Sequence, residues 1–300
     1  MDIKTLLGST QSLITLPEAY LRIRDMIEQP EVSLTEIGYV VELDPNLSAR
    51  VLRLVNSAAY GIPGRVDSID RAIKLVGLRE LQLIVLAASA AKTFADIDSS
   101  LADMHSFWHH GVFTALAAKF LAYQRRLAHS DRLFTAGLLH DIGQLPMYFH
   151  MPAQSQTLLR RLDAAQKEPQ EESTIPLRIR LEREIFGYDH AQVSAGLLRA
   201  WRLPESLCQP IEHHHTPSQT TEYPVETAVL HIAQQMGEHY EPSLPTRQVV
   251  PGASGKVEIG AVNWWMSGLG EADIPPALNE VNNQFFEIFE LIAPASTLVV

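Results

Sequence analysis

The feature that most constrains this chain is the three- and four-residue spacing of its apolar residues, which recurs from one end of the sequence to the other. The segment after Asp44-Pro45 shows it clearly, because an aspartate that can cap a helix precedes a proline at the first helical position. Apolar residues then follow at helical spacing: Leu47, Val51, Leu52, Leu54, Val55 and Ala58. Gly61 lies just beyond them as a terminator. This pattern predicts a helix with one face packed inward.

Other segments carry the same signals, and none shows a convincing run of alternating polar and apolar residues. Ser33-Leu-Thr-Glu36 has the form of a capping box. Gly77 separates a helical pattern over Ile69–Val76 from a longer run over Leu78–Phe94. Further helices are predicted over about 106–128, 131–143, 153–166, 175–186, 189–202, 204–214, 225–240 and 277–292. The sequence therefore predicts an all-α protein.

We expect the chain to form two helical lobes and an extension. The Asp/Ser-rich stretch near residue 100 is the best boundary, which gives an N-terminal lobe over 1–100 and a second lobe over 101–240. The extension, residues 241–300, is expected to be a loop plus a terminal helix, with Trp264-Trp265 folded back onto the body. The polar, acidic run Lys167–Thr174 predicts an exposed connector.

The charge of the chain disfavours nucleic acid as a partner. The net charge is −11 and no stretch is strongly basic, so the electrostatic attraction that drives most nucleic-acid binding has no source. Membranes are disfavoured too, because the most apolar stretch, Leu81–Ala91, is too short to cross a bilayer. We expect neither a nucleic-acid nor a membrane partner.

The location of the protein is predicted from its cysteine content and its first residues. The single cysteine, Cys208, cannot form an internal disulfide, and its surroundings predict a packed helix interior. The first residues lack the long apolar core and the cleavage site of a signal peptide. A cytoplasmic protein is expected.

Imidazole and carboxylate groups occur at five points where packed helices can bring them together. These points are His109-His110, His140-Asp141, His190, His213-His214-His215 and His231. Each alone is a weak signal, because a single histidine in a helix is usually a satisfied polar residue. In combination, histidine nitrogens and a carboxylate oxygen suit iron, manganese or zinc, so the set predicts a divalent metal site.

The residues around these points resemble a known family. GLLHDIG (Gly137–Gly143) is similar to the central motif of the HD superfamily of metal-dependent phosphohydrolases. The stretches LDPNLSARVLRLVNSAAYG (Leu43–Gly61) and SIDRAIKLVGLREL (Ser68–Leu81) resemble the signature of the HDOD domain, an HD-related output domain of bacterial signalling proteins. The resemblance runs from about Leu16 to Gly237. It implies a multi-helix, HD-domain-like bundle with an N-terminal helical lobe.

The same resemblance implies a set of metal ligands. They are His110 in FWHHG, His140, Asp141, His190 in FGYDHAQV, His214 and His215. His109 and His213 are then neighbours of ligand positions. The alternative is that these residues form a polar core that holds helices together, in which each buried group needs a hydrogen-bond partner.

Two positions depart from the pattern of active relatives. Gln144 stands where the related HD-GYP phosphodiesterases have a lysine, and HHHTPSQT contains no GYP element. Gln234 stands where active nucleotide-hydrolysing relatives have a terminal aspartate ligand. Phosphoester cleavage needs metals and cations to stabilise developing charge, so both changes argue against hydrolysis.

The sequence thus favours a bacterial signalling module that acts through contacts with a partner protein and has a degenerate HD-type metal site. The alternative is a metal-dependent phosphohydrolase acting on a nucleotide or cyclic dinucleotide, in which the ligand set holds one or two metals and activates water. A DNA-binding regulator is a third class, and it would need a basic face assembled from scattered arginines. No oligomeric state is indicated.

Overall fold

The regular structure of the chain is almost entirely helical, which confirms the all-α prediction. The computed structural model describes residues 1–13, 16–29, 31–93, 101–127, 130–165, 175–243, 248–251 and 259–293. The helices are α1 (Ile3–Leu13), α2 (Glu18–Ile27), α3 (Leu34–Glu42), α4 (Pro45–Asn56), α5 (Ile69–Val76), α6 (Leu78–Thr93), α7 (Met104–Gln124), α8 (Ser130–Leu139), α9 (Gln144–His150), α10 (Pro152–Ala165), α11 (Leu177–Phe186), α12 (His190–Ala200), α13 (Glu205–His213), α14 (Pro224–His239), α15 (Ala261–Ser267) and α16 (Ile274–Ile292).

The helix starts that the sequence marked are present. Ser33 and Glu36 form a reciprocal capping box at the start of α3. The Asp44 carboxylate accepts hydrogen bonds from the backbone N–H groups of Asn46 and Leu47 at the start of α4. Gly77, with φ of 87°, separates α5 from α6 as predicted. Local capping therefore sets these boundaries.

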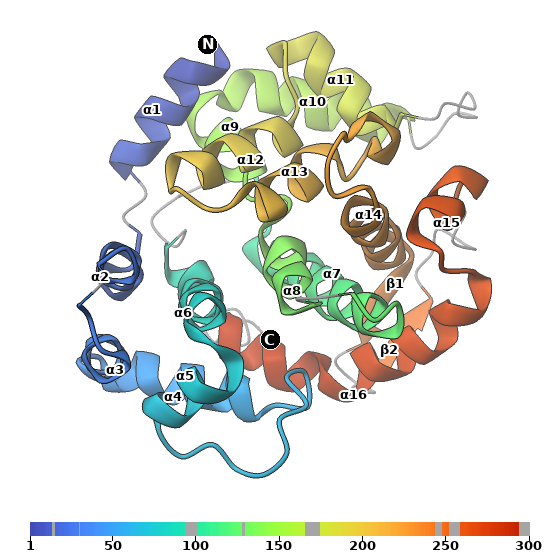
Figure 1. Cartoon of the computed structure of the whole chain (residues 1–300). Coiled ribbons are helices and arrows are strands. Elements are labelled where there is room, and N and C mark those ends of the chain that lie inside the picture. The colour runs from blue at the N-terminus through green and yellow to red at the C-terminus, as the bar shows by residue number, and fades with distance from the viewer. Residues whose placement is uncertain are drawn as a thin grey trace.

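Helix α7 lies at the centre of the molecule, against α8, α14 and α16 (Figure 1). Its residues from Gly111 to Lys119 are all buried, so it packs on every side and not along one stripe. A Cβ atom on Gly137 of α8 would lie 2.6 Å from the Ala115 backbone, so only glycine allows α7 and α8 to approach this closely.

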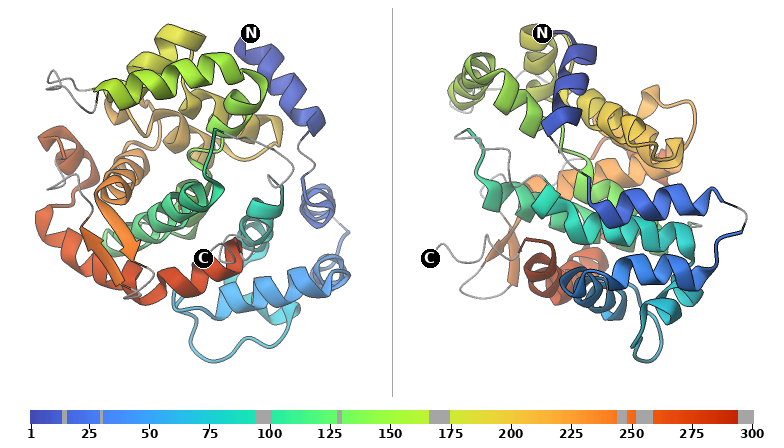
Figure 2. Two further views of the ribbon diagram at one scale, coloured as in Figure 1. Left: turned by 180° about the vertical axis from the view of Figure 1, so that it is seen from behind. Right: turned by 90° about the vertical axis from the view of Figure 1, so that its left-hand side faces the viewer.

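Helices α2 to α6 pack on one another, and α6 joins this group to α8. Helix α1 lies instead against α9 and α12, as Figures 1 and 2 show. Asn56, the last residue of α4, holds the following loop, because its side chain exchanges two hydrogen bonds of 2.7 Å with the Val66 backbone. The Asn56 side chain therefore has a structural role at this loop.

The C-terminal extension is more regular than the sequence predicted. Tyr240–Ser243 (β1) and Gln248–Pro251 (β2) pair as an antiparallel two-stranded sheet. A four-residue strand that contains a proline is too short to show an alternation of polar and apolar residues. The sequence therefore did not predict these two strands. The expected terminal helix is confirmed as α16, which lies against α4, α6 and α7. It completes the core.

Two other expectations need correction. The helix predicted over 131–143 ends at Leu139, because residues 140–143 form a turn before α9. Of the tryptophan pair, Trp264 packs against the core, but Trp265 is 81% exposed. Only half of the pair folds back.

Some expectations lie outside the described residues. The proposed boundary near residue 100 falls mostly within 94–100, and the polar connector Lys167–Thr174 falls within 166–174. Within the described part of the chain, no helix combines the length and apolar character needed to cross a membrane.

Candidate metal centre

The turn after α8 presents His140 and Asp141 to the interior. His140 is fully buried, and its ring Nδ1 lies 2.7 Å from the Gly137 carbonyl oxygen one turn earlier. Asp141 is 17% exposed. Because a carbonyl can only accept, Nδ1 of His140 carries the proton and Nε2 is left with a lone pair. The Nε2 atom lies 3.3 Å from Asp141 Oδ1.

Gly143, the last residue of GLLHDIG, brings α12 against this turn. A Cβ atom at this position would lie 2.3 Å from the His190 carbonyl oxygen and 2.6 Å from the Ser194 nitrogen. The Gly143 N–H also donates to the Ser194 hydroxyl at 2.8 Å. Only glycine permits this approach, which sets His190 beside the aspartate.

The start of α12 fixes the position of His190. Asp189 caps the helix in a capping box with Gln192, and Arg183 pairs with the same carboxylate at 2.8 Å. His190 is the first helical residue, and its backbone N–H donates to Glu182. Its Nδ1 lies 2.7 Å from the same Glu182 oxygen, and its Nε2 lies 3.0 Å from Asp141 Oδ1.

His214 and His215 close the group from the end of α13. His214 Nε2 lies 3.9 Å from Asp141 Oδ1, and its Nδ1 lies 2.6 Å from the Ile211 carbonyl oxygen. His215 Nε2 lies 3.1 Å from His190 Nε2. Both residues are buried.

His110, on α7, approaches from the other side of the turn. Its ring centroid is 5.1 Å from that of His140. The structure thus brings all six residues that the resemblance named to one place. They form two sets that share Asp141, one with His190, His214 and His215, and one with His110 and His140, and the potential ligand atoms of each set lie within 4.8 Å of one another.

This donor set fits a divalent metal ion. Nε2 of His140 and of His214 are buried and have no hydrogen-bond partner among the described residues. A buried nitrogen lone pair without a partner is unfavourable in a polar core, but it is what a metal ligand requires. Imidazole nitrogens with one carboxylate suit iron, manganese or zinc. Asp141 belongs to both sets, so its carboxylate would be a ligand in either of them.

Burial and charge set the protonation states. Burial lowers the pKa of His140 to about 4 and lowers the pKa of His214 and of His215 well below the ordinary value. Burial alone would raise the pKa of Asp141, but the rings of His140 and His190 hold it well below its usual range. His140, His214 and His215 are therefore neutral imidazoles beside an ionised aspartate.

His190 is the exception. Burial opposes its positive charge, but the Glu182 and Asp141 carboxylates on its two sides outweigh that effect and raise its pKa well above the ordinary value. Metal binding by His190 requires loss of its second ring proton.

A closed circuit of polar contacts supports the cluster, and sequence reasoning missed most of it. Gln144 Nε2 donates to Asp141 Oδ2 at 2.7 Å, and the Tyr148 hydroxyl donates to Gln144 Oε1 at 3.1 Å. Arg178 Nη1 donates to the Tyr148 oxygen at 3.1 Å and lies 3.6 Å from Glu182 Oε1. Glu182 then contacts His190, which returns to Asp141. The four-residue spacings from Gln144 to Tyr148 and from Arg178 to Glu182 were the available signal.

Other residues that the sequence singled out point elsewhere. His109 packs against His105 and, edge to face, against Phe285 and Phe289 of α16. The Gln234 amide donates to Glu238 and accepts from Gln235, both on α14.

His231 contacts the cluster only at its margin, because its Nδ1 lies 2.7 Å from the backbone carbonyl of His214. His213 is half-buried and belongs to neither ligand set of the described residues.

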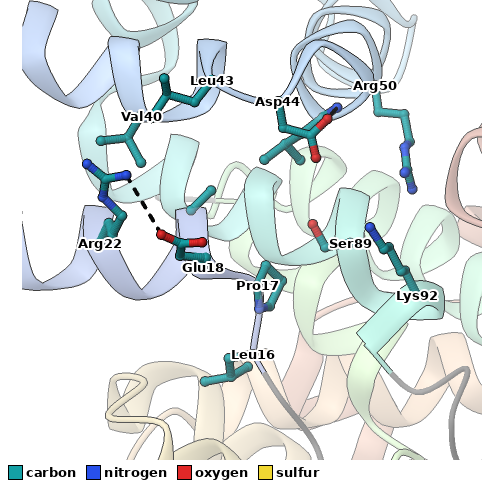
Figure 3. A pocket seen from close by; sticks show the side chains of 12 residues that line it. Leu16, Pro17, Glu18, Arg22, Val40, Leu43, Asp44, Arg50, Ser89 and Lys92 are labelled. Carbon is teal, nitrogen blue, oxygen red and sulfur yellow. Dashed lines mark hydrogen bonds and ion pairs between the residues drawn. The ribbon is translucent and has the colours of Figure 1, made fainter.

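A separate cleft of about 490 Å³ opens among the N-terminal helices. Figure 3 shows Arg50, Lys92 and Ser89 around it, and Arg22 paired with Glu18 at its edge. No residue of the His/Asp cluster lines this cleft. It is therefore distinct from the candidate metal centre.

Comparison with known proteins identifies relatives in sequence. The family profile of the HDOD domain matches residues 13–217. This match starts slightly before the resemblance predicted from Leu16 and stops before its expected end at Gly237. An uncharacterized protein of Treponema pallidum (strain Nichols) is 31% identical over 210 residues, which cover 69% of this chain and 39% of that protein. The chain thus spans well under half of that relative's length.

Solved structures share the fold. A "Putative phosphohydrolase" from Shewanella amazonensis SB2B is 25% identical with a TM-score of 0.69, covering 96% of this chain and 98% of that one. An HDOD domain protein with unknown function from Geobacter sulfurreducens is 22% identical with a TM-score of 0.66, covering 98% of both chains. A "Putative signal transduction protein" from Marinobacter aquaeolei VT8 is 21% identical with a TM-score of 0.64, covering 93% of this chain and 59% of that one.

Proposed function

Because this chain belongs to the HDOD domain family, we propose that it is a bacterial signalling module whose buried His/Asp cluster holds a divalent metal ion and which acts through contacts with a partner protein. Family membership confirms the resemblance seen in the sequence. In this role the chain would act in the cytoplasm, as its single cysteine suggests.

The observation that carries the metal proposal is the direction of the ring nitrogens. In His140, His190 and His214, Nδ1 is engaged with a carbonyl or carboxylate oxygen, and Nε2 lies within 3.9 Å of Asp141 Oδ1. A hydrogen-bonded Nδ1 holds each ring in orientation and leaves Nε2 for a metal. A purely structural polar core would instead pair these buried nitrogens with donors.

Two observations support the signalling proposal. One is membership of the HDOD family, and the other is that Gln144 and Gln234 are both hydrogen-bonded to neighbouring side chains. Gln144 is committed to Asp141 and Tyr148, and Gln234 is committed to residues of its own helix. Neither supplies the lysine or the aspartate that active relatives have at these positions. The related structure from Marinobacter aquaeolei, whose name refers to signal transduction, extends well beyond the matched part, which suits a module used in longer proteins.

Metal-dependent phosphoester hydrolysis is the second candidate. The two ligand sets that share Asp141 favour it, because a pair of metals can bind both a nucleophile and a phosphoryl oxygen. The name of the Shewanella amazonensis relative agrees with this chemistry.

An activity assay separates the two candidates. The protein is loaded with Fe²⁺ or Mn²⁺ and incubated with nucleotides and with cyclic dinucleotides, beside Asp141→Ala treated identically. The signalling proposal expects no turnover above the Asp141→Ala background. Metal-dependent turnover that disappears in Asp141→Ala would contradict it and establish the enzyme.

A further inference from the structure

We propose that the cleft among the N-terminal helices binds a small organic anion, whose carboxylate is held by Arg50 and Lys92 and whose apolar body packs on the opposite wall. The cleft, of about 490 Å³, lies among α2, α3, α4 and α6 and has the size of a small-molecule site. Among the described residues that line it, none belongs to the His/Asp cluster, so this role does not depend on metal binding.

Arg50 and Lys92 come from two different helices but reach the same part of the cleft. Arg50 lies on α4, and its Nη1 donates to the Ala88 carbonyl oxygen of α6 at 3.0 Å. Lys92 lies four residues after Ala88, which places it about 6 Å further along the same helix face. Because helical side chains lean toward the N-terminus, the Lys92 side chain is directed back toward the Arg50 guanidinium. Figure 3 shows both side chains on the side of the cleft where Ser89 lies.

These two cations lack a counter-charge. Within the part of the chain that the structure describes, no carboxylate forms an ion pair with either of them. The carboxylates that line the same cleft are engaged elsewhere. Glu18 pairs with Arg22 at 3.8 Å, as the dashed line in Figure 3 shows, and Asp44 caps α4 by accepting from two backbone N–H groups. Two neighbouring cations repel each other, and an anion bound between them would relieve that repulsion.

The charge balance of the cleft favours a ligand with a single negative charge. Its walls carry three cationic side chains, Arg22, Arg50 and Lys92, and two carboxylates, Glu18 and Asp44, which leaves one positive charge. The whole chain has a net charge of −11, so this positive excess is local. A monoanion neutralises it, whereas a dianion would add a further negative charge near the two carboxylates.

The donors match a carboxylate group. The bond from Arg50 to the Ala88 carbonyl holds the guanidinium in orientation without neutralising its charge. Its remaining N–H groups can form two parallel hydrogen bonds to the oxygens of a carboxylate, and the Lys92 ammonium can donate a third. Charge-assisted bonds of this kind are roughly twice as strong as neutral ones.

The other side of the cleft is apolar. Six of the twelve described residues that line the cleft are apolar: Leu16, Pro17, Ala19, Val40, Leu43 and Leu47. Figure 3 shows Val40 and Leu43 across the cleft from Lys92. Leu43 is 50% exposed, so contact with a ligand would remove apolar surface from water. A carboxylate with a short apolar body uses both sides of the cleft, whereas an inorganic anion uses only one.

The test titrates three matched probes into the protein: hexanoate, acetate and 1-hexanol. Hexanoate has the charge and the apolar body, acetate lacks the body, and 1-hexanol lacks the charge. Methyl-group NMR spectra report both the affinity and the location of each probe, because Val40, Leu43 and Leu47 carry methyl groups in the wall of the cleft.

Two variants each remove one positive charge from the cleft, and each has a matched control. Lys92→Gln changes an exposed side chain in the last turn of α6, and its control is Lys74→Gln, which changes an exposed side chain in the last turn of α5 outside the cleft. Arg50→Gln is compared with Arg53→Gln, at an exposed position of α4 outside the cleft. Circular dichroism verifies that each variant is folded.

We expect hexanoate to shift the methyl groups of the cleft, and acetate and 1-hexanol to bind at least about 10-fold more weakly. Lys92→Gln and Arg50→Gln should each weaken hexanoate binding roughly 10-fold, and both controls should stay within about twofold of wild type. If Arg50→Gln does not fold, Lys92→Gln decides alone.

Four results would each overturn the proposal. They are no binding of hexanoate to wild-type protein at about 10 mM, shifts confined to methyl groups outside the cleft, acetate or 1-hexanol binding as tightly as hexanoate, and wild-type hexanoate affinity in Lys92→Gln.

Discussion

His190 Nε2 lies 3.0 Å from Asp141 Oδ1, although the two residues are 49 positions apart in the chain. The contact joins the first residue of α12 to the turn that follows α8. It exists because Gly143 lets the two backbones touch and because Glu182 holds the far side of the imidazole. The centre is therefore a product of helix packing, and changes to that packing should affect metal binding and stability together.

Gly143→Ala should lower both the stability of the protein and its affinity for metal. The added methyl group would collide with the backbone of His190 and Ser194, so α12 must move away from the turn. We expect a loss of about 1–3 kcal/mol in the free energy of unfolding, together with weaker metal binding. Chemical denaturation and metal titration measure the two effects.

Gly8→Ala is the matched control. Nothing lies within 4 Å of a Cβ atom at Gly8 in α1, so this change should be neutral or stabilise the helix by about 0.5–1 kcal/mol. Equal stabilities of the Gly143→Ala protein and the wild type would contradict the close approach of α12.

Asn56→Ala should destabilise the N-terminal helices. The substitution removes both hydrogen bonds to the Val66 backbone. The N–H and C=O groups of Val66, a buried residue, then lose these partners. We expect a loss of about 1–3 kcal/mol in urea denaturation. Asn46→Ala, at an exposed position of the same helix, should change stability by less than about 0.5 kcal/mol. Similar effects of the two changes would show that the Asn56 contact contributes nothing.

The Glu80 carboxyl should make stability fall as pH rises. Burial raises the pKa of Glu80 to about 7, with Asp131 adding to the effect and Lys119 opposing it. Between its ordinary value of 4.5 and about 7, the folded protein keeps a proton that the unfolded chain has released. The free energy of unfolding should decrease across this window by at most about 3 kcal/mol from this group.

Glu80→Gln tests this dependence, because the amide does not titrate. Urea denaturation at pH 5 and pH 8 should show a smaller decrease for Glu80→Gln than for the wild type. Glu42→Gln, which changes an exposed carboxyl of α3, should keep the wild-type decrease. If Glu80→Gln and wild type lose the same stability between the two pH values, Glu80 does not titrate in this window.

The sequence predicted the helix boundaries that capping residues and glycines determine locally. Caps at Ser33 and Asp44 and the break at Gly77 marked helices to within a residue or so. The motifs also predicted which imidazoles meet around Asp141, because the resemblance carried that information. Periodicity failed where a helix runs into a turn of buried residues, as after Leu139, because apolar spacing continues through it.

The polar contacts that connect Asp141 to Gln144, Tyr148 and Arg178 could not be predicted in the same way. Gln144 contacts Tyr148 on its own helix, and Arg178 of α11 contacts Tyr148 only in the folded protein, so the sequence does not show that these residues support Asp141. A spacing of four residues indicates that two side chains share a helix face, but it does not indicate what that face meets.

His213 and His214 provide a direct comparison of neighbours. His214→Gln removes a nitrogen that lies 3.9 Å from Asp141, and should weaken metal binding by roughly 10-fold or more. His213→Gln, at a half-buried position next to it in the chain, should leave metal affinity unchanged. Competition with a chromogenic chelator measures both affinities. The opposite order would show that the ligand set has been assigned to the wrong histidine.

Elemental analysis measures whether the His/Asp cluster holds a divalent metal ion. Wild-type protein and Asp141→Asn are purified side by side, loaded with Fe²⁺, Mn²⁺ or Zn²⁺, freed of excess metal and analysed for metal per chain. We expect one or two ions per wild-type chain, and almost none in a folded Asp141→Asn protein. Wild-type protein that retains no metal, or Asp141→Asn that retains as much as wild type, would contradict it.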